Sequence, residues 1–268
     1  MARRLGNHSP CQKPLTHTVF EARVLTNLAR KHKVATQMGN QGHSNPDSRR
    51  YVELIQAGVL GDVKEVHIWT DRPIWPQGIG RPSGSPPVPK NVNWDLWLGP
   101  APERPYHPAY HPFKWRGFWD FGTGAVGDMG CHNSDLAYWA LNLRDPETLE
   151  AVSSGINDET APKWSIITYH FPKLGKRKAV KVTWYDGGKK PDPALARQKE
   201  LPGNGSILIG SKDSLYIPIY WGKGTFLSGA TVADHTAVPE TIEHPADLTP
   251  HHHLERIGAR TAPKPPRP

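Results

Sequence analysis

The chain has 268 residues, of which 37% are hydrophobic and 22% charged, so it is long enough to bury a core. Its two cysteines exclude a disulfide framework and a zinc site made of four thiols, and no apolar run is long enough to span a membrane. The net charge of +8 raises the question of nucleic acid, but no recognition-helix, RNP or zinc-finger pattern accompanies it, so we expect no nucleic-acid partner.

The first predicted helix and strand lie within residues 18–38. Thr18 and Glu21 have the spacing of a capping box, which predicts a helix from there through about Lys31. The apolar residues at positions 22, 25, 28 and 29 share one face of this helix. Residues 34–38 are then predicted to form a short buried strand that ends in a polar loop.

A second helix and another strand follow. Asn45 can cap a helix whose first turn holds Pro46, and Gly58 is typical of its end. Residues 64–70 alternate in polarity and predict a strand, with Val66 and Ile68 on one side. The order helix, strand, helix is typical of α/β proteins.

Residues 73–122 show little periodicity, hold eleven prolines and are rich in aromatic side chains. One interpretation is a long loop that packs its own aromatics into a small satellite core. The other is a wall of flat rings that stack on the C–H faces of a sugar. The aromatic residues concerned are Trp75, Trp94, Trp97, Tyr106, Tyr110, Phe113, Trp115, Phe118 and Trp119.

The last predicted elements are a helix over residues 128–142 and a sheet. Alternating runs at 164–171, 179–185 and 206–210, the last turning toward 215–219, are joined by short turns, which favours antiparallel pairing. Beyond about Thr231 the periodicity disappears, and we expect a poorly ordered tail.

The glycine-rich segment over residues 122–135, GTGAVGDMGCHNSD, can carry chemistry. Its glycines would let the backbone approach a ligand and turn into a helix. Asp128 and His132 are four residues apart, so they share one helix face. A carboxylate beside an imidazole suits proton abstraction from a hydroxyl near neutral pH. On spacing alone, a salt bridge on the helix surface explains the pair as well. We interpret Cys131 as a packing thiol.

Lys13 precedes Pro14, which biases the lysine toward an extended conformation at a turn. With its surroundings, this segment resembles the glucose–fructose oxidoreductase / inositol dehydrogenase (Gfo/Idh/MocA) family. Residues 11–41 resemble the family's E-K-P turn, the helix after it and the last Rossmann strand, and 50–70 resemble its crossover into the substrate domain. Residues 94–105 and 115–139 resemble its loop and catalytic helix, in the family's order.

The resemblance implies residues 1–44 as the C-terminal remnant of a dinucleotide-binding Rossmann domain. It implies residues 45–230 as an α+β substrate domain with an open, mainly antiparallel sheet, and leaves 231–268 as an irregular tail. The activity implied is hydride transfer between a hydroxyl-bearing carbon of a sugar or polyol and NAD or NADP. The catalytic residues implied are Lys13, Asp128 and His132, with His132 as the proton acceptor. The residues implied at the cofactor are Gln12, Lys13, Pro14, Asn40 and Gln41.

Two features depart from the family pattern. Gln12 stands where the family usually has Glu, which removes a charge near the cofactor. No G-x-G-x-x-G motif follows a predicted strand, so no phosphate-binding loop is identified, and the resemblance implies that about a hundred residues of a Rossmann half are missing upstream. The activity is therefore expected to be impaired.

Other interpretations remain open. One is an enzyme that cleaves glycosides with the help of bound NAD, and another is a non-catalytic module that binds a sugar or a protein partner. A metal site made of His107, His111 and the run of residues 251–253 is a further alternative. By analogy with the family we expect a homo-oligomer through the open sheet. Arg3 and Arg4 are not followed by the apolar segment of an export signal, so we expect a cytoplasmic protein.

Overall fold

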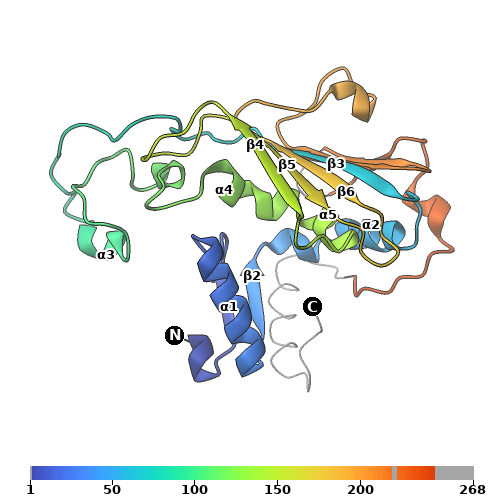
Figure 1. Cartoon of the computed structure of the whole chain (residues 1–268), viewed down its shortest axis with the longest axis horizontal. Coiled ribbons are helices and arrows are strands. Elements are labelled where there is room, and N and C mark those ends of the chain that lie inside the picture. The colour runs from blue at the N-terminus through green and yellow to red at the C-terminus, as the bar shows by residue number, and fades with distance from the viewer. Residues whose placement is uncertain (1, 219–221, 245–268) are drawn as a thin grey trace.

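The computed structural model describes residues 2–218 and 222–244 of the chain (Figure 1). Its strands form two sheets. A two-stranded parallel sheet pairs β1 (Ser9–Gln12) with β2 (Thr36–Gly39) beside the helix α1 (Val19–His32). A seven-stranded sheet has the order β4-β5-β6-β3-β7-β8-β9. The fold is therefore mixed α/β with one large, mostly antiparallel sheet, as the sequence predicted.

The helix α1 begins where the capping box predicted. The backbone N–H of Glu21 donates to the Thr18 hydroxyl at 3.1 Å, and the Glu21 carboxylate accepts from the Thr18 N–H at 3.0 Å. The helix ends at Lys33, which has a left-handed backbone conformation. The strand after it, β2, starts two residues later than predicted and is half-exposed, so the prediction of a buried strand at 34–38 was wrong in that respect.

Five strands of the large sheet, β3 and β5 to β8, lie close to where alternation predicted them, whereas β4 and β9 were not predicted. The parallel pair in it is β3 with β6, and every other pair is antiparallel. The strands are β3 (Val63–Trp69), β4 (Thr148–Ser153), β5 (Ser165–Phe171), β6 (Val180–Tyr185), β7 (Gly205–Gly210), β8 (Ser214–Ile217) and β9 (Thr225–Phe226).

Three helices cover one face of this sheet and separate it from the two-stranded sheet (Figure 1). They are α2 (Pro46–Gln56), α4 (Gly124–Asn133) and α5 (Asp135–Ala140). As predicted, Asn45 caps α2 through the N–H of Ser48. The single helix predicted over 128–142 is instead two helices that meet at Ser134, and the first of them begins four residues earlier. The main core lies between these helices and the sheet.

The segment over residues 73–122 extends away from the sheet and carries the short helix α3 (Trp94–Leu98) and the 3-10 helix η3 (Lys114–Gly117) (Figure 1). Many of its rings pack on one another: Trp94 stacks on Trp97 with centroids 4.7 Å apart, and Tyr110 packs edge-on against Phe118 at 4.7 Å. The satellite-core interpretation is therefore correct for the buried rings, which include Trp75, Tyr106, Tyr110 and Phe118.

Residues 231–244 hold only the short 3-10 helix η5 (Val232–His235), but they are bound to α2. The buried Glu53 carboxylate accepts hydrogen bonds from the backbone N–H groups of Thr241 and Ile242, and Arg50 donates to the carbonyl oxygen of Val238 at 2.8 Å. The prediction of a poorly ordered tail from Thr231 was therefore wrong up to residue 244. Residues 245–268 lie outside the described residues. Among the described residues, no helix is long and apolar enough to cross a membrane.

Candidate functional site

Lys13 and Asp128, both predicted as catalytic residues, meet across 115 residues of sequence. Lys13 follows the last residue of β1, and its Nζ lies 2.9 Å from Oδ1 of Asp128 and 2.8 Å from the Asp128 carbonyl oxygen. The two side chains are 23% and 12% exposed, so the ion pair is only partly screened by water. The contact joins the end of the small sheet to α4.

A second cation, which sequence reasoning missed, binds the same carboxylate. Nε of Arg116 donates to Oδ1 of Asp128 at 3.1 Å. Its guanidinium carbon lies 4.6 Å from the ring centroid of Phe113 and 4.7 Å from that of Trp115, which fixes the side chain by cation–π contact. Asp128 therefore faces two positive charges. The aromatic residues around Arg116 were the one sequence signal that could have indicated a fixed arginine.

His132 lies one turn after Asp128 on α4, as its spacing predicted. Burial lowers the pKa of its imidazole, the Lys13 charge lowers it further, and Asp128 and Asp135 only partly oppose them. The net pKa is below the usual 6.5, so the ring is neutral at neutral pH and able to accept a proton. Burial raises the pKa of the Cys131 thiol to about 11, which fits a packing role for that residue.

The residues predicted at a cofactor lie at one edge of the two-stranded sheet. Gln12 pairs in register with Gly39, so Lys13 and Asn40 both follow the carboxyl ends of their strands. The Gln12 side chain lies directly over Gly39, where an added Cβ would come within 2.2 Å of its Oε1. Asn40 is buried and donates to Asp135 at 3.2 Å, and Gln41 begins the 3-10 helix η2 (Gln41–Ser44).

The glycines before and within α4 are packed against the chain itself. Residues 122–127 have the spacing G-x-G-x-x-G, but no strand precedes them. A Cβ at Gly122 would lie 2.5 Å from the Arg116 carbonyl oxygen, and one at Gly127 would lie 1.6 Å from the Thr123 hydroxyl oxygen. The expectation that these glycines open the backbone to a ligand was therefore wrong for Gly122 and Gly127, because protein atoms fill that space.

Three open cavities surround the loop after β1. One of about 610 Å³ is lined by Lys13, Phe20 and Trp115, among others, and one of about 440 Å³ lies between residues 14–16, α4 and the sheet. A third of about 540 Å³ is lined in part by Trp97, Trp115 and Phe121. Trp97 and Trp115 belong to the aromatic residues predicted to stack on a sugar, so sugar stacking stays a prediction for them.

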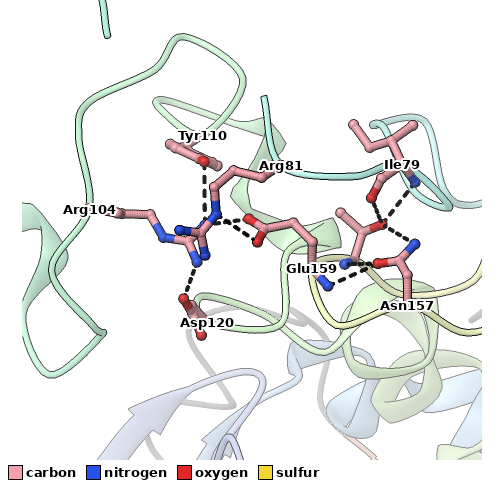
Figure 2. Close-up of polar contacts among 8 residues, drawn as sticks. Ile79, Arg81, Arg104, Tyr110, Asp120, Asn157 and Glu159 are labelled. Atoms are coloured by element: carbon pink, nitrogen blue, oxygen red, sulfur yellow. Dashed lines mark hydrogen bonds and ion pairs between the residues drawn. The ribbon is translucent and has the colours of Figure 1, made fainter. Parts of the chain in front are cut away.

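A buried arginine binds several parts of the aromatic segment together (Figure 2). Arg104, whose side chain is 4% exposed, binds the carboxylates of Asp120 and Glu159 and donates to the Tyr110 hydroxyl at 3.3 Å. Its guanidinium also lies 5.1 Å from the centroid of the Phe121 ring. Because a buried cation requires such partners, the segment is held in one arrangement rather than left as a loose loop.

No three histidine, cysteine, aspartate or glutamate side chains converge into a metal site within the described part of the chain. His107 and His111 lie in the aromatic segment, where the His107 ring packs on Tyr110 and the His111 ring on Trp97. The run of histidines at 251–253, which the metal hypothesis also needs, lies outside the described residues.

An aldose–aldose oxidoreductase from Caulobacter crescentus, crystallised with glycerol, superposes with a TM-score of 0.61 and 15% identity over 99% of this chain and 65% of that one. A WlbA dehydrogenase from Chromobacterium violaceum, in complex with NADH and UDP-GlcNAcA, gives 0.58 and 14% over 99% and 64%. An oxidoreductase from Thermotoga maritima gives 0.55 and 15% over 97% and 62%.

The chain thus spans less than two thirds of the length of each of these structures, and identities this low show the fold alone. No curated protein matches the sequence. Residues 47–178 match the family described as "Oxidoreductase family, C-terminal alpha/beta domain". This segment contains Asp128, His132 and three of the seven strands of the large sheet, β3, β4 and β5. It therefore forms a C-terminal α/β domain of the Gfo/Idh/MocA oxidoreductase family.

Proposed function

We propose that the protein takes part in hydride transfer between a hydroxyl-bearing carbon of a sugar or polyol and NAD or NADP. The observation that carries the proposal is the contact of Lys13 with Asp128, which brings the end of a parallel strand pair to the helix that holds His132. The carboxyl ends of parallel strands are a usual place for a dinucleotide to bind. A neutral imidazole facing that place is suited to abstracting a hydroxyl proton.

The residues fit one end of a dinucleotide. Gln12, Lys13, Pro14, Asn40 and Gln41 would hold the nicotinamide end, where a cation, amides and the cavity beside Trp115 are available. The glycines at 122–127 do not fit the pyrophosphate, because protein atoms fill the space that the phosphates would need. We propose residues 1–44 as part of a dinucleotide-binding unit in which this chain supplies the nicotinamide side.

In this proposal, the side chains of the protein carry out the proton transfer. The bound nicotinamide would supply the hydride acceptor. His132 would accept the proton of the substrate hydroxyl while the C–H hydrogen leaves as hydride, so that the carbinol becomes a carbonyl. Lys13 would donate a hydrogen bond to the substrate oxygen, and Asp128, held by Arg116, would orient the Lys13 ammonium.

The test is reduction of NAD and NADP by a panel of aldoses, inositols and uronic acids, followed by the absorbance of the reduced cofactor. We expect at least one substrate to react. K13M and H132N should each lower the rate at least about a hundredfold, because proton transfer in the transition state contributes that much or more. K31M, which removes an exposed lysine of α1, is the matched control and should keep the rate.

The pH profile adds a second readout. The rate should fall as the pH drops through the pKa of His132, which lies below 6.5, because the protonated ring cannot accept a proton. A chain that turns over equally well after K13M and H132N contradicts the proposal. A chain that binds a sugar saturably, but reduces no cofactor with any of the panel, favours the non-catalytic sugar-binding alternative instead.

A further inference from the structure

Asp135, the first residue of α5, is held by two side chains from the segment after β2. Nδ1 of His43 lies 2.9 Å from one carboxylate oxygen and 3.0 Å from the other. Nδ2 of Asn40 donates to Oδ1 at 3.2 Å. The carboxylate therefore ties η2 to the junction between α4 and α5, and it joins positions more than ninety residues apart.

His43 is oriented by a second contact on the same helix. Its ring stacks on Trp139, one turn after Asp135, with centroids 4.0 Å apart and planes 21° apart. The guanidinium carbon of Arg49 lies 6.0 Å from the Trp139 ring. A ring that is both stacked and hydrogen-bonded has few orientations open to it, so the imidazole presents Nδ1 to Asp135.

Asp135 also belongs to the surroundings of His132, which precedes it by one turn. The two residues line one small cleft together with Asn40, His43 and Cys131. The charged groups that face His132 are Lys13 from the loop after β1, Asp128 from its own helix and Asp135 from α5. Of these, the two carboxylates raise the pKa of His132, and they do so because they stabilise its protonated form.

We propose that Asp135 and His43 are positioning residues for His132, with His43 fixing the Asp135 carboxylate and the carboxylate stabilising the imidazolium that forms after proton transfer. Asn40 binds the same carboxylate, so a ligand that displaces the Asn40 amide would also change the contacts of Asp135. The proposal rests on the proposed role of His132 as proton acceptor, and it adds a physical link between the predicted cofactor contact Asn40 and the base.

The test is an NMR pH titration of the His132 ring in the full chain, without cofactor. D135N should lower the titration midpoint by about one pH unit, because a facing carboxylate is lost. H43A should move the midpoint by at least about 0.3 unit in the wild-type background and by almost nothing in the D135N background. H43N, whose amide nitrogen can occupy the place of Nδ1, should restore most of the wild-type value.

H67N is the matched control, because it disturbs another histidine–carboxylate pair, His67 with Glu65 on β3. It should leave the His132 midpoint unchanged. An unchanged midpoint in D135N overturns the proposal, as does an equal effect of H43A in both backgrounds. If D135N does not fold, the comparison of H43A with H43N in the wild-type background carries the test, and equal His132 midpoints in these two variants overturn the proposal.

The titration separates this proposal from the proposed function. It uses neither NADH nor a sugar, so its outcome does not depend on cofactor binding. Coupling of His43, Asp135 and His132 in a chain that reduces no cofactor would contradict the hydride-transfer proposal and support the positioning role. Turnover in a chain that shows no such coupling would support the hydride-transfer proposal and contradict the positioning role of His43 and Asp135.

Discussion

Nζ of Lys13 lies 2.9 Å from Oδ1 of Asp128, and Arg116 binds the same oxygen at 3.1 Å. Replacing Asp128 by Asn leaves two cations side by side without the anion that they share. We expect D128N to lower the free energy of unfolding by about 1–3 kcal/mol, the usual range for a hydrogen bond to a charged group. K13M should cost less, because Arg116 still pairs with Asp128. Urea denaturation of the two variants compares them, and a larger loss in K13M would contradict this account.

The buried Arg104 gives a second matched comparison, because Arg104 and Arg81 bind the same residue, Glu159 (Figure 2). R104M removes a cation that is 4% exposed and leaves Asp120 and Glu159 facing its place. We expect a loss of about 3 kcal/mol or more in unfolding free energy. R81M removes a cation that is 59% exposed and should cost less than about 1 kcal/mol. Equal losses would show that Arg104 does not hold the aromatic segment in place.

Two glycines of α4 should respond in opposite ways to alanine. An added Cβ at Gly127 would lie 1.6 Å from the Thr123 hydroxyl oxygen, whereas at Gly130 the nearest atom is 3.7 Å away. G127A should therefore destabilise the protein by about 1–3 kcal/mol through overpacking. G130A should be neutral or stabilise by up to about 1 kcal/mol, the helix-propensity gain of alanine over glycine. Thermal melts of both variants test the pair, and a tolerated G127A would contradict the close packing.

The stability of the protein should depend on pH through Glu53. Burial alone would raise the pKa of this carboxyl, but the N–H groups of Ile242 and Thr241, with Arg50 and His244, outweigh it and lower the pKa to about 2. The folded-state pKa is thus below the usual 4.5, so the stabilisation is complete above pH 4.5 and is lost as the pH falls from there toward 2. Guanidinium unfolding at several pH values should show this slope.

The variant E53Q supplies the comparison for that slope. It keeps the size of the side chain but has no carboxyl to titrate, so its stability should change less between pH 4.5 and 2. It should also be less stable than the wild type near neutral pH, because Arg50 loses its charged partner. Parallel slopes in the two proteins would mean that Glu53 is not the group responsible.

Local signals in the sequence predicted those elements whose ends are formed by residues close together in the sequence. The capping box at Thr18 and the cap at Asn45 are formed by residues three positions apart, and both occur where expected. The strand β4 escaped prediction because it is an edge strand with both faces largely exposed, so its side chains need no alternation. The strand β1 contains Pro10, which argues against a strand except at an edge.

Long-range contacts account for what the sequence could not predict at the site. The spacing of Asp128 and His132 follows from one helix, but Arg116 and Asp135 acquire their roles from partners on other elements. Likewise, nothing in the aperiodic residues 231–244 indicates that Glu53 and Arg50 of α2 bind them. Such pairings depend on how the elements pack, and sequence periodicity carries no information about that packing.

The most direct test of the account is an NMR titration of the protein with NADH, read at the Asn40 side-chain amide and the His132 ring. We expect saturable shifts at both signals. The shifts should be lost in K13M and kept in K31M. A folded protein whose Asn40 and His132 signals do not move at millimolar NADH would contradict the claim that a nicotinamide ring binds at Lys13 and Asn40, beside the proton acceptor His132.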